Sequence, residues 1–231
     1  LQRFFEPILD LTEQYNILQS AMASSERIFE VLDTDEAIPA PAEPKAVDAR
    51  GGKIEFDRVW FAYDDENWVL QDVSFVIEPG QTVAFVGATG AGKTSIINLM
   101  ARYYDIQKGS IKIDGVDIRE IDLDTLRRQI GVVLQDVFMF SGTIRDNILV
   151  GRPDATDEEI IAVSRYVNAD PFIRRLPHGY DERVMERGAT LSSGERQLLA
   201  FARTLLADPA ILVLDEATAS IDTNTEIYIQ D

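Results

Sequence analysis

The feature that most constrains this chain is a glycine-rich run at residues 87–94, Gly-Ala-Thr-Gly-Ala-Gly-Lys-Thr, which fits the pattern G-x-x-x-x-G-K-[ST]. A short apolar segment, residues 82–86, comes directly before it, and residues 94–103 after it favour a helix. Glycine lets backbone N–H groups turn inward toward an anion, and the start of a helix adds partial positive charge. The pattern therefore predicts a buried strand, a phosphate-binding loop and a helix in succession.

The last two side chains of the run supply a full positive charge and a metal-binding oxygen, which backbone amides lack. Lys93 brings a positive charge for the β- and γ-phosphates of a nucleotide, and Thr94 brings a hard oxygen that suits Mg²⁺. The chain carries 22 basic and 40 acidic residues, a formal net charge of −18. An anion must therefore bind at a locally positive loop, and non-specific binding of nucleic acid is disfavoured. A glycine-rich turn without a ligand is the alternative interpretation.

An acidic pair follows the apolar segment Ile211–Leu214. If this segment is a buried strand, Asp215 at its end lies beside the phosphate loop and can hold Mg²⁺ directly or through water. Glu216 can then orient or deprotonate the attacking water. The alternative is a pair of acids that caps the next helix.

The rest of the chain predicts an α/β domain with a helical lead-in. Apolar residues recur at helical spacing through residues 1–32, and a segment rich in proline, alanine and glycine, residues 33–51, forms a linker. From Lys53 onward, strands alternate with helices, which indicates a mostly parallel sheet. The lead-in helix packs either on the core of this chain or on another domain; the spacing fits both.

Several classes of site are excluded by composition. Cysteine is absent and His178 is the single histidine, so a disulfide framework, a thiolate metal site and a multi-histidine metal site cannot form. No run of about 18 apolar residues that could span a bilayer is present. We expect His178 to lie in an exposed loop.

A third motif, Leu191-Ser192-Ser193-Gly194-Glu195, stands between the phosphate loop and the acidic pair. With these motifs in this order, the chain from about Lys53 onward resembles the nucleotide-binding domain of ABC transporters, of the exporter type. The resemblance implies a P-loop NTPase fold with a RecA-like, mostly parallel sheet core, an antiparallel β-subdomain and a helical signature subdomain. It places the domain at residues 52–231 and the helical subdomain at about residues 136–200.

The resemblance also implies the roles of individual residues in binding ATP and Mg²⁺. It assigns the ATP contacts to Tyr63, Gly87, Ala88, Thr89, Gly90, Ala91, Gly92, Lys93, Thr94, Ser95 and Gln135. It assigns catalysis to Glu216, Lys93 and Gln135, and the Mg²⁺ shell to Thr94, Gln135 and Asp215. Tyr63 would stack on adenine, although a core tyrosine is the alternative interpretation.

A second nucleotide-binding domain is the partner that the resemblance implies. The signature segment Leu191–Glu195 would contact the ATP of that partner, with Asp222 in the neighbouring D-loop. Ser193 and Glu195 stand where the family usually has glycine and glutamine. A simple capping box of Ser192 and Glu195 is a further interpretation of the same residues, and both can hold together.

The function implied is an ATP-hydrolysing motor at the cytoplasmic face of a membrane, joined to transmembrane domains through the lead-in, where Ser24–Asp33 resembles exporters. The chain ends shortly after Asp215, before the switch histidine of the family, so we expect a truncated domain that hydrolyses ATP weakly alone. A soluble ABC-type ATPase of nucleic-acid or translation processes is an alternative. However, the stretch from Gln135 to Leu191 suits a compact subdomain and no long coiled coil. A non-catalytic nucleotide-binding regulator is a further alternative.

Overall fold

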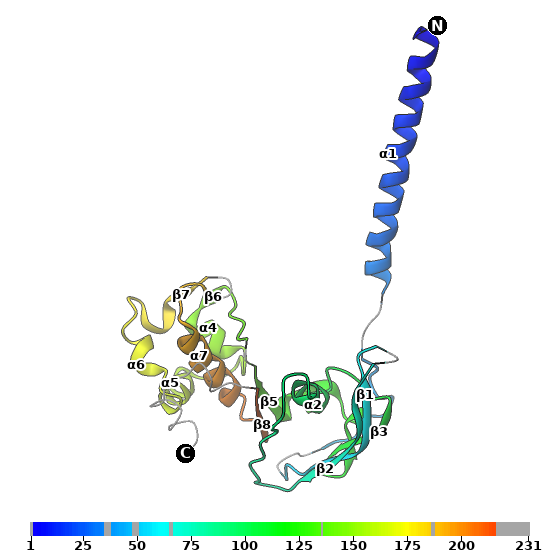
Figure 1. Cartoon of the computed structure of the whole chain (residues 1–231). Coiled ribbons are helices and arrows are strands. Elements are labelled where there is room, and N and C mark those ends of the chain that lie inside the picture. Colours follow the sequence, from blue (N-terminus) through cyan, green and yellow to red (C-terminus); the bar gives the residue numbers. More distant parts are fainter. Residues whose placement is uncertain are drawn as a thin grey trace. The chain divides into compact units, whose positions relative to one another are not determined.

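The structure, a computed structural model, describes residues 2–34, 38–47, 51–64, 67–134, 136–185 and 188–215. Gln135, Glu216 and Asp222, which the sequence singled out, lie outside the described residues. The chain divides into two compact units, Leu1–Pro39 and Ala40–Asp231 (Figure 1).

The first unit consists mainly of one long helix, α1 (Gln2–Asp33). The helix predicted over residues 1–32 is therefore confirmed. At its C-terminal end the Thr34 hydroxyl donates a hydrogen bond to the Glu30 carbonyl oxygen, which occupies one of the last carbonyls of the helix. Large apolar side chains of α1, from Leu11 to Leu32, are exposed. In the part of the chain that the structure describes, no helix combines the length and apolar character needed to cross a membrane.

An antiparallel sheet with the strand order β2-β1-β3-β4 begins the second unit. Its strands are β1 (Ile54–Ala62), β2 (Trp68–Ile77), β3 (Lys108–Ile113) and β4 (Val116–Asp117). Ile54 pairs with Ile77 on one side and Ile113 on the other. The register of the β1–β2 pairing shifts between Phe56 and Val59, so β1 is irregular there.

A parallel pair of strands joins two distant parts of the sequence. β5 (Ile130–Val133) pairs with β8 (Ile211–Leu214), from Ile130 opposite Ile211 to Val133 opposite Leu214. The pairing continues for one further bond, because the Asp215 N–H donates to the Val133 carbonyl oxygen at 3.0 Å. The predicted strand at 211–214 and its parallel pairing are therefore confirmed, whereas its burial is only partial, since Leu212 and Leu214 are exposed.

The prediction of a buried strand at residues 82–86 is wrong for this structure. These residues form no strand, and the side chains of Val83 and Val86 are 46% and 94% exposed. A buried strand requires neighbouring strands to pair its backbone groups and cover its side chains. Among the described residues, this segment has no such ladder partner, and only Phe85 packs partly against the core.

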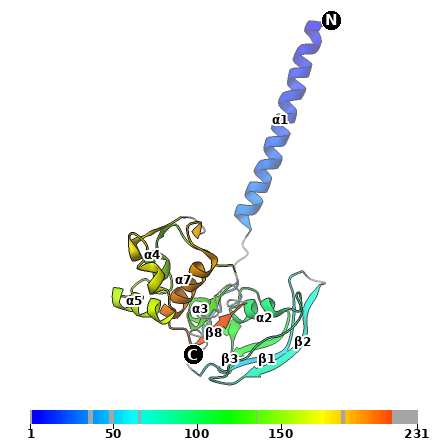
Figure 2. The ribbon, with the colours of Figure 1, turned by 60° about the vertical axis from the view of Figure 1, so that its left-hand side comes forward.

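The helices of the second unit contribute to two hydrophobic clusters. They are α2 (Lys93–Met100), α3 (Leu123–Gln129), α4 (Ile144–Leu149), α5 (Asp157–Tyr166), α6 (Asp170–Ile173) and α7 (Ser193–Leu206), with short 3-10 turns at Ile118–Glu120 and Gly179–Asp181 and a small hairpin of β6 (Gly142–Thr143) and β7 (Arg183–Val184). Figure 2 shows the ribbon of these helices, with α4, α5 and α7 in one group and α2 beside the antiparallel strands. One cluster combines the antiparallel sheet with α2 and α3, and the other combines α4, α5, α6 and α7. β5 contributes to both, through Ile130 in the first and Val133 in the second.

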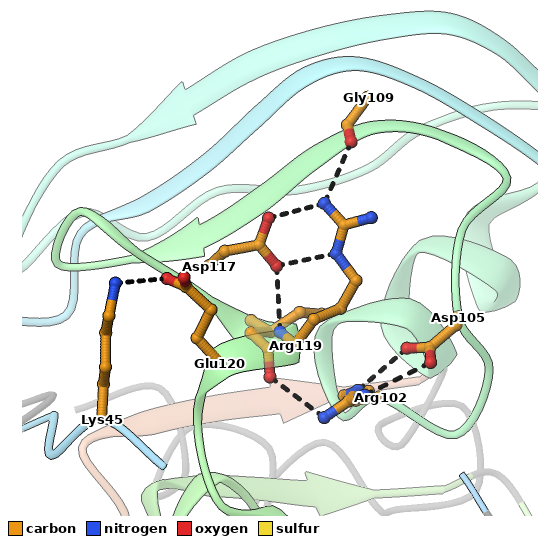
Figure 3. Close-up of polar contacts among 8 residues, drawn as sticks. Lys45, Arg102, Asp105, Gly109, Asp117, Arg119 and Glu120 are labelled. Carbon is orange, nitrogen blue, oxygen red and sulfur yellow. Dashed lines mark hydrogen bonds and ion pairs between the residues drawn. The ribbon is translucent and has the colours of Figure 1, made fainter. Parts of the chain in front are cut away.

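Polar contacts attach the start of the second unit, residues 40–47, to the rest of that unit (Figure 3). The Lys45 ammonium pairs with Glu120 at 2.9 Å, and the backbone of Lys45 bridges to Ile121. Nearby, Arg102 is buried and its guanidinium donates to the Asp105 carboxylate at 2.8 Å. Because the Asp105 carboxylate pairs with this buried charge, the Arg102–Asp105 ion pair anchors the turn after α2.

Candidate functional site

The glycine-rich loop has the backbone that its sequence predicts. Gly90 and Gly92 have φ values of +83° and +89°, in the left-handed region that favours glycine. A Cβ on Gly92 would also lie 2.7 Å from the Leu70 Cδ2 atom. Gly92 is the N-cap of α2, and no side chain caps the helix there. The first N–H groups of α2 therefore remain available to an anion, and the helix adds its partial positive charge.

Lys93 is held over the loop by the loop itself. Its ammonium group donates to the carbonyl oxygens of Gly87 and Ala88 at 2.9 and 3.1 Å. Residues 87–91 are exposed, and so is Thr94 in the first turn of α2. The ammonium, the free N–H groups and the Thr94 hydroxyl thus gather at one exposed place, and this donor set fits a triphosphate with a hard cation.

Tyr63 lies beside the same turn of α2. Its hydroxyl is 3.0 Å from the Ser95 hydroxyl, and its ring makes edge contacts with Phe61 and Tyr104 at 4.8 and 5.0 Å between centroids. The Tyr63 side chain is 48% exposed, whereas Phe61 is buried. An accessible aromatic face therefore lies near the start of the phosphate loop helix, as adenine stacking requires.

Asp215 lies at the C-terminal end of β8 and is half-buried. Among the described residues, no hydrogen bond or ion pair joins it to the phosphate loop. Within the same residues, no group of three or more histidine, cysteine, aspartate or glutamate side chains is placed to hold a metal. The predicted Mg²⁺ ligands are the Thr94 hydroxyl, the Asp215 carboxylate and the Gln135 amide, so this site does not require a cluster of acidic or histidine side chains. Gln135 lies outside the described residues.

The signature segment starts α7, in the second hydrophobic cluster. Ser192 is the N-cap, and its hydroxyl accepts from the Glu195 N–H at 3.2 Å. The Glu195 carboxylate in turn accepts from the Ser192 N–H and the Ser192 hydroxyl, both at 2.8 Å. Leu191 is buried, while Ser192 and Ser193 are exposed. The capping box expected from the sequence is therefore confirmed, and the exposed His178 agrees with the loop expected for it.

One polar network escaped the sequence analysis. Arg203 in α7 reaches across to Asn147 in α4 and to the carbonyl oxygen of Phe138. From sequence alone, an arginine near the end of a helix is expected to be a solvent-exposed charge. What distinguishes Arg203 from such a residue is its contact with the buried Asn147. That burial arises from tertiary packing and leaves no local signal in the sequence.

The ABC transporter family model matches residues 70–219, more than half of the chain. An uncharacterised ABC transporter ATP-binding protein, YknV, of Bacillus subtilis (strain 168) is 53% identical over 100% of this chain and 38% of its own length. A fatty acid ABC transporter ATP-binding/permease protein of Mycobacterium bovis (strain ATCC BAA-935 / AF2122/97) is 49% identical over 100% of this chain and 36% of its own length. The solved structure of a bacterial Atm1-family ABC exporter with ATP bound is 41% identical, with a TM-score of 0.84, over 94% of this chain and 38% of that one.

These likenesses agree with the geometry of the loop and of the signature helix. The chain spans a little over a third of the length of the curated relatives that it matches. The matched region contains the phosphate loop, the signature segment and Asp215. The resemblance inferred from the motifs is thereby confirmed, and the chain belongs to the ABC transporter family.

Proposed function

We propose that this chain is the ATP-binding and ATP-hydrolysing motor domain of an ABC-type membrane exporter. The observation that carries the proposal is the exposed loop at residues 87–94, where an uncapped helix start and the Lys93 ammonium form a site for a triphosphate. It is a local positive site in a chain with a net charge of −18. The fatty acid transporter and the Atm1-family exporter, which carry ATP-binding parts of the same family, support the same function.

The bound group would be ATP with Mg²⁺. Tyr63 stacks on the adenine, the loop from Gly87 to Ser95 holds the phosphates, and Thr94 and Asp215 hold Mg²⁺. Magnesium supplies charge neutralisation at the phosphates when it is bound. Gln135 completes the metal shell and Glu216 orients the attacking water; these two roles rest on the sequence motifs alone.

Two such domains work together in a head-to-tail dimer with two ATP molecules at the interface. The helix that follows the phosphate loop, α2, contributes to one hydrophobic cluster, and Leu191 of the signature segment contributes to the other. In the dimer, the segment Leu191–Glu195 contacts the ATP of the partner and Asp222 lies close to the interface. One copy alone therefore hydrolyses ATP weakly, because its site lacks the partner's signature. The parallel pair β5 and β8 belongs to a larger RecA-like sheet.

The lead-in helix α1 connects this motor to transmembrane domains at the cytoplasmic face of a membrane. Residues of one helix face recur at alternating intervals of four and three. This spacing is typical of a seam, the stripe of mainly apolar side chains by which one helix packs against another. The seam comprises Leu11, Tyr15, Leu18, Met22, Ser25, Phe29 and Leu32, whose large apolar members are exposed. Cysteine cross-linking from position 18 to helices of the transmembrane domains tests this; cross-links confined to residues of Ala40–Asp231 would contradict it.

The two alternative functions have less support. A soluble ATPase that acts on nucleic acid requires a basic surface, whereas this chain is strongly acidic. A non-catalytic nucleotide-binding regulator has no need of the acidic pair Asp215 and Glu216, which this chain retains.

Replacement of Lys93 by alanine tests the proposal. We expect Lys93→Ala to abolish measurable binding of a fluorescent ATP analogue, a loss of about 100-fold or more, because two charged phosphates lose their cation. Lys108→Ala is the matched control, since it removes the same charge from an exposed position on β3, outside the loop. Equal affinities for Lys93→Ala and the unmodified chain would refute the site.

A further inference from the structure

Arg203 is a half-buried cation whose hydrogen bonds, among the described residues, all go to uncharged acceptors. Its guanidinium donates to the Asn147 carbonyl oxygen at 2.9 Å, to the Phe138 carbonyl oxygen at 3.1 Å and to the Asn147 Oδ1 atom at 3.2 Å. It also lies over the Phe140 ring, 5.6 Å from the centroid. Burial lowers the pKa of Arg203 below its ordinary value. Because this charge is partly removed from water and no carboxylate among the described residues pairs with it, holding it here costs stability.

Asn147 extends the network along the chain. Its side chain is fully buried and holds three backbone groups: Nδ2 donates to the Phe140 and Thr143 carbonyl oxygens, and Oδ1 accepts from the Phe140 N–H, all at 2.9 Å. Arg203 and Asn147 together therefore fix the path of the backbone from Phe138 to Thr143.

The close approach of two helices makes this fixation rigid. Gly151, just after α4, lies against the backbone of α7, where a Cβ would overlap the Arg203 carbonyl oxygen. The packing leaves no slack between α4 and α7, so a shift of the segment at 138–143 must move α7 with it. α7 begins with the signature residues, ten positions before Arg203 at Ser193.

The other end of the fixed segment leads to the nucleotide side of the domain. Phe138 is the third residue after Gln135, and β5, which precedes both, pairs with the strand that ends at Asp215. We propose that Arg203 is a positioning residue that couples nucleotide occupancy of the phosphate loop to the signature start of α7, through the Phe138 carbonyl and Asn147. The inference rests on the proposed function, because it requires that the loop binds ATP.

An arginine suits this role better than a lysine. Its planar guanidinium reaches acceptors on two separate segments at fixed angles, whereas an ammonium group is a point charge on a flexible stem. Lysine at position 203 has three donors on one nitrogen without a fixed direction, so it would hold the two segments less rigidly. A rigid connection between the two segments therefore requires arginine. Filling the same space without such a connection would not require arginine.

Amide hydrogen exchange of the chain, with and without Mg²⁺ and a slowly hydrolysed ATP analogue, tests the coupling. In the unmodified chain we expect the analogue to slow exchange at residues 192–198 by about tenfold. In Arg203→Met, which keeps an unbranched apolar stem but removes the guanidinium, this difference should fall to within about twofold. Affinity for a fluorescent ATP analogue should stay within about threefold, since the phosphate loop is untouched. Arg203→Lys should restore the difference only in part.

Arg175→Met is the control, because Arg175 is an exposed arginine of the same helical region that donates to the Pro171 carbonyl oxygen. It should respond to nucleotide as the unmodified chain does. A merely structural Arg203 would give faster exchange in both conditions with the nucleotide difference intact, and that result overturns the proposal. An unmodified chain that binds the analogue without any change at 192–198 overturns it as well.

Two further outcomes separate this inference from the proposed function. If the unmodified chain binds no ATP analogue, the proposed function fails and this inference fails with it. If Arg203→Met does not fold, as circular dichroism would reveal, Arg203→Lys decides alone: a reduced nucleotide difference supports the coupling, and an unchanged one refutes it.

Discussion

The starts of helices α2 and α7 solve the same physical problem in opposite ways. Both leave N–H groups without intrahelical acceptors, as every α-helix does. At α2 the N-cap is Gly92 in the left-handed conformation, and no side chain reaches the free N–H groups. At α7 the N-cap is Ser192, and Glu195 closes a reciprocal capping box around it.

Because of this difference, the two helix starts differ in how readily they can bind an anion. The start of α2 is open, exposed and supplied with the Lys93 ammonium, so it is ready for a phosphate. The start of α7 already holds an anion of its own, the Glu195 carboxylate, in hydrogen bonds to Ser192. Under the proposed function, a phosphate from a partner would compete with that carboxylate. One chain would then combine an open helix start with one that is already occupied.

The largest effect should follow from removing the open start of α2. Gly92→Ala places an L side chain at a φ of +89° and brings its Cβ to 2.7 Å from Leu70. We expect the affinity for a fluorescent ATP analogue to fall at least about tenfold and the free energy of unfolding to fall by about 1–3 kcal/mol. Gly115→Ala, at a φ of +82° with open space around it, should lose stability without losing affinity. Equal affinity losses in both variants would argue against a special loop.

Ser192→Ala should have an intermediate effect, on stability. It removes the N-cap of a helix that contributes Leu198, Leu199 and Phe201 to the second cluster. We expect a loss of about 1 kcal/mol in the free energy of unfolding, measured by urea denaturation. Ser193→Ala, one position later and exposed, should stay within about 0.5 kcal/mol of the unmodified chain. A loss at position 193 as large as that at 192 would speak against the capping box.

Glu195→Gln should have the smallest effect on stability. It should lower stability slightly but promote dimer formation. Glutamine can still accept from the Ser192 N–H, but it removes the negative charge from the helix start, at a cost of about 0.3–1 kcal/mol. Under the proposed function, the partner's phosphate then meets no repulsion. The fraction of dimer in sedimentation experiments with the slowly hydrolysed ATP analogue should therefore rise. A lower dimer fraction would contradict the idea that Glu195 competes with phosphate.

Local patterns carried most of what the sequence analysis predicted correctly. The phosphate loop, the capping box at Ser192 and the lead-in helix each depend on residues close together in the chain. The strand at Ile211–Leu214 was also predictable, because a short apolar run bounded by turn signals is itself local. The same reasoning failed at residues 82–86, since a strand needs partners that no local pattern can guarantee.

The sequence by itself determined the backbone of the glycine-rich loop and the start of α2, because glycine conformations and a helix start follow from residues 87–94 alone. Only the tertiary structure decided which distant groups meet. It joined β5 to β8, brought Tyr63 to Ser95, and brought Arg203 to the buried Asn147. The physical reason is that backbone conformation is a property of neighbouring residues, whereas burial and pairing depend on how the whole chain closes upon itself.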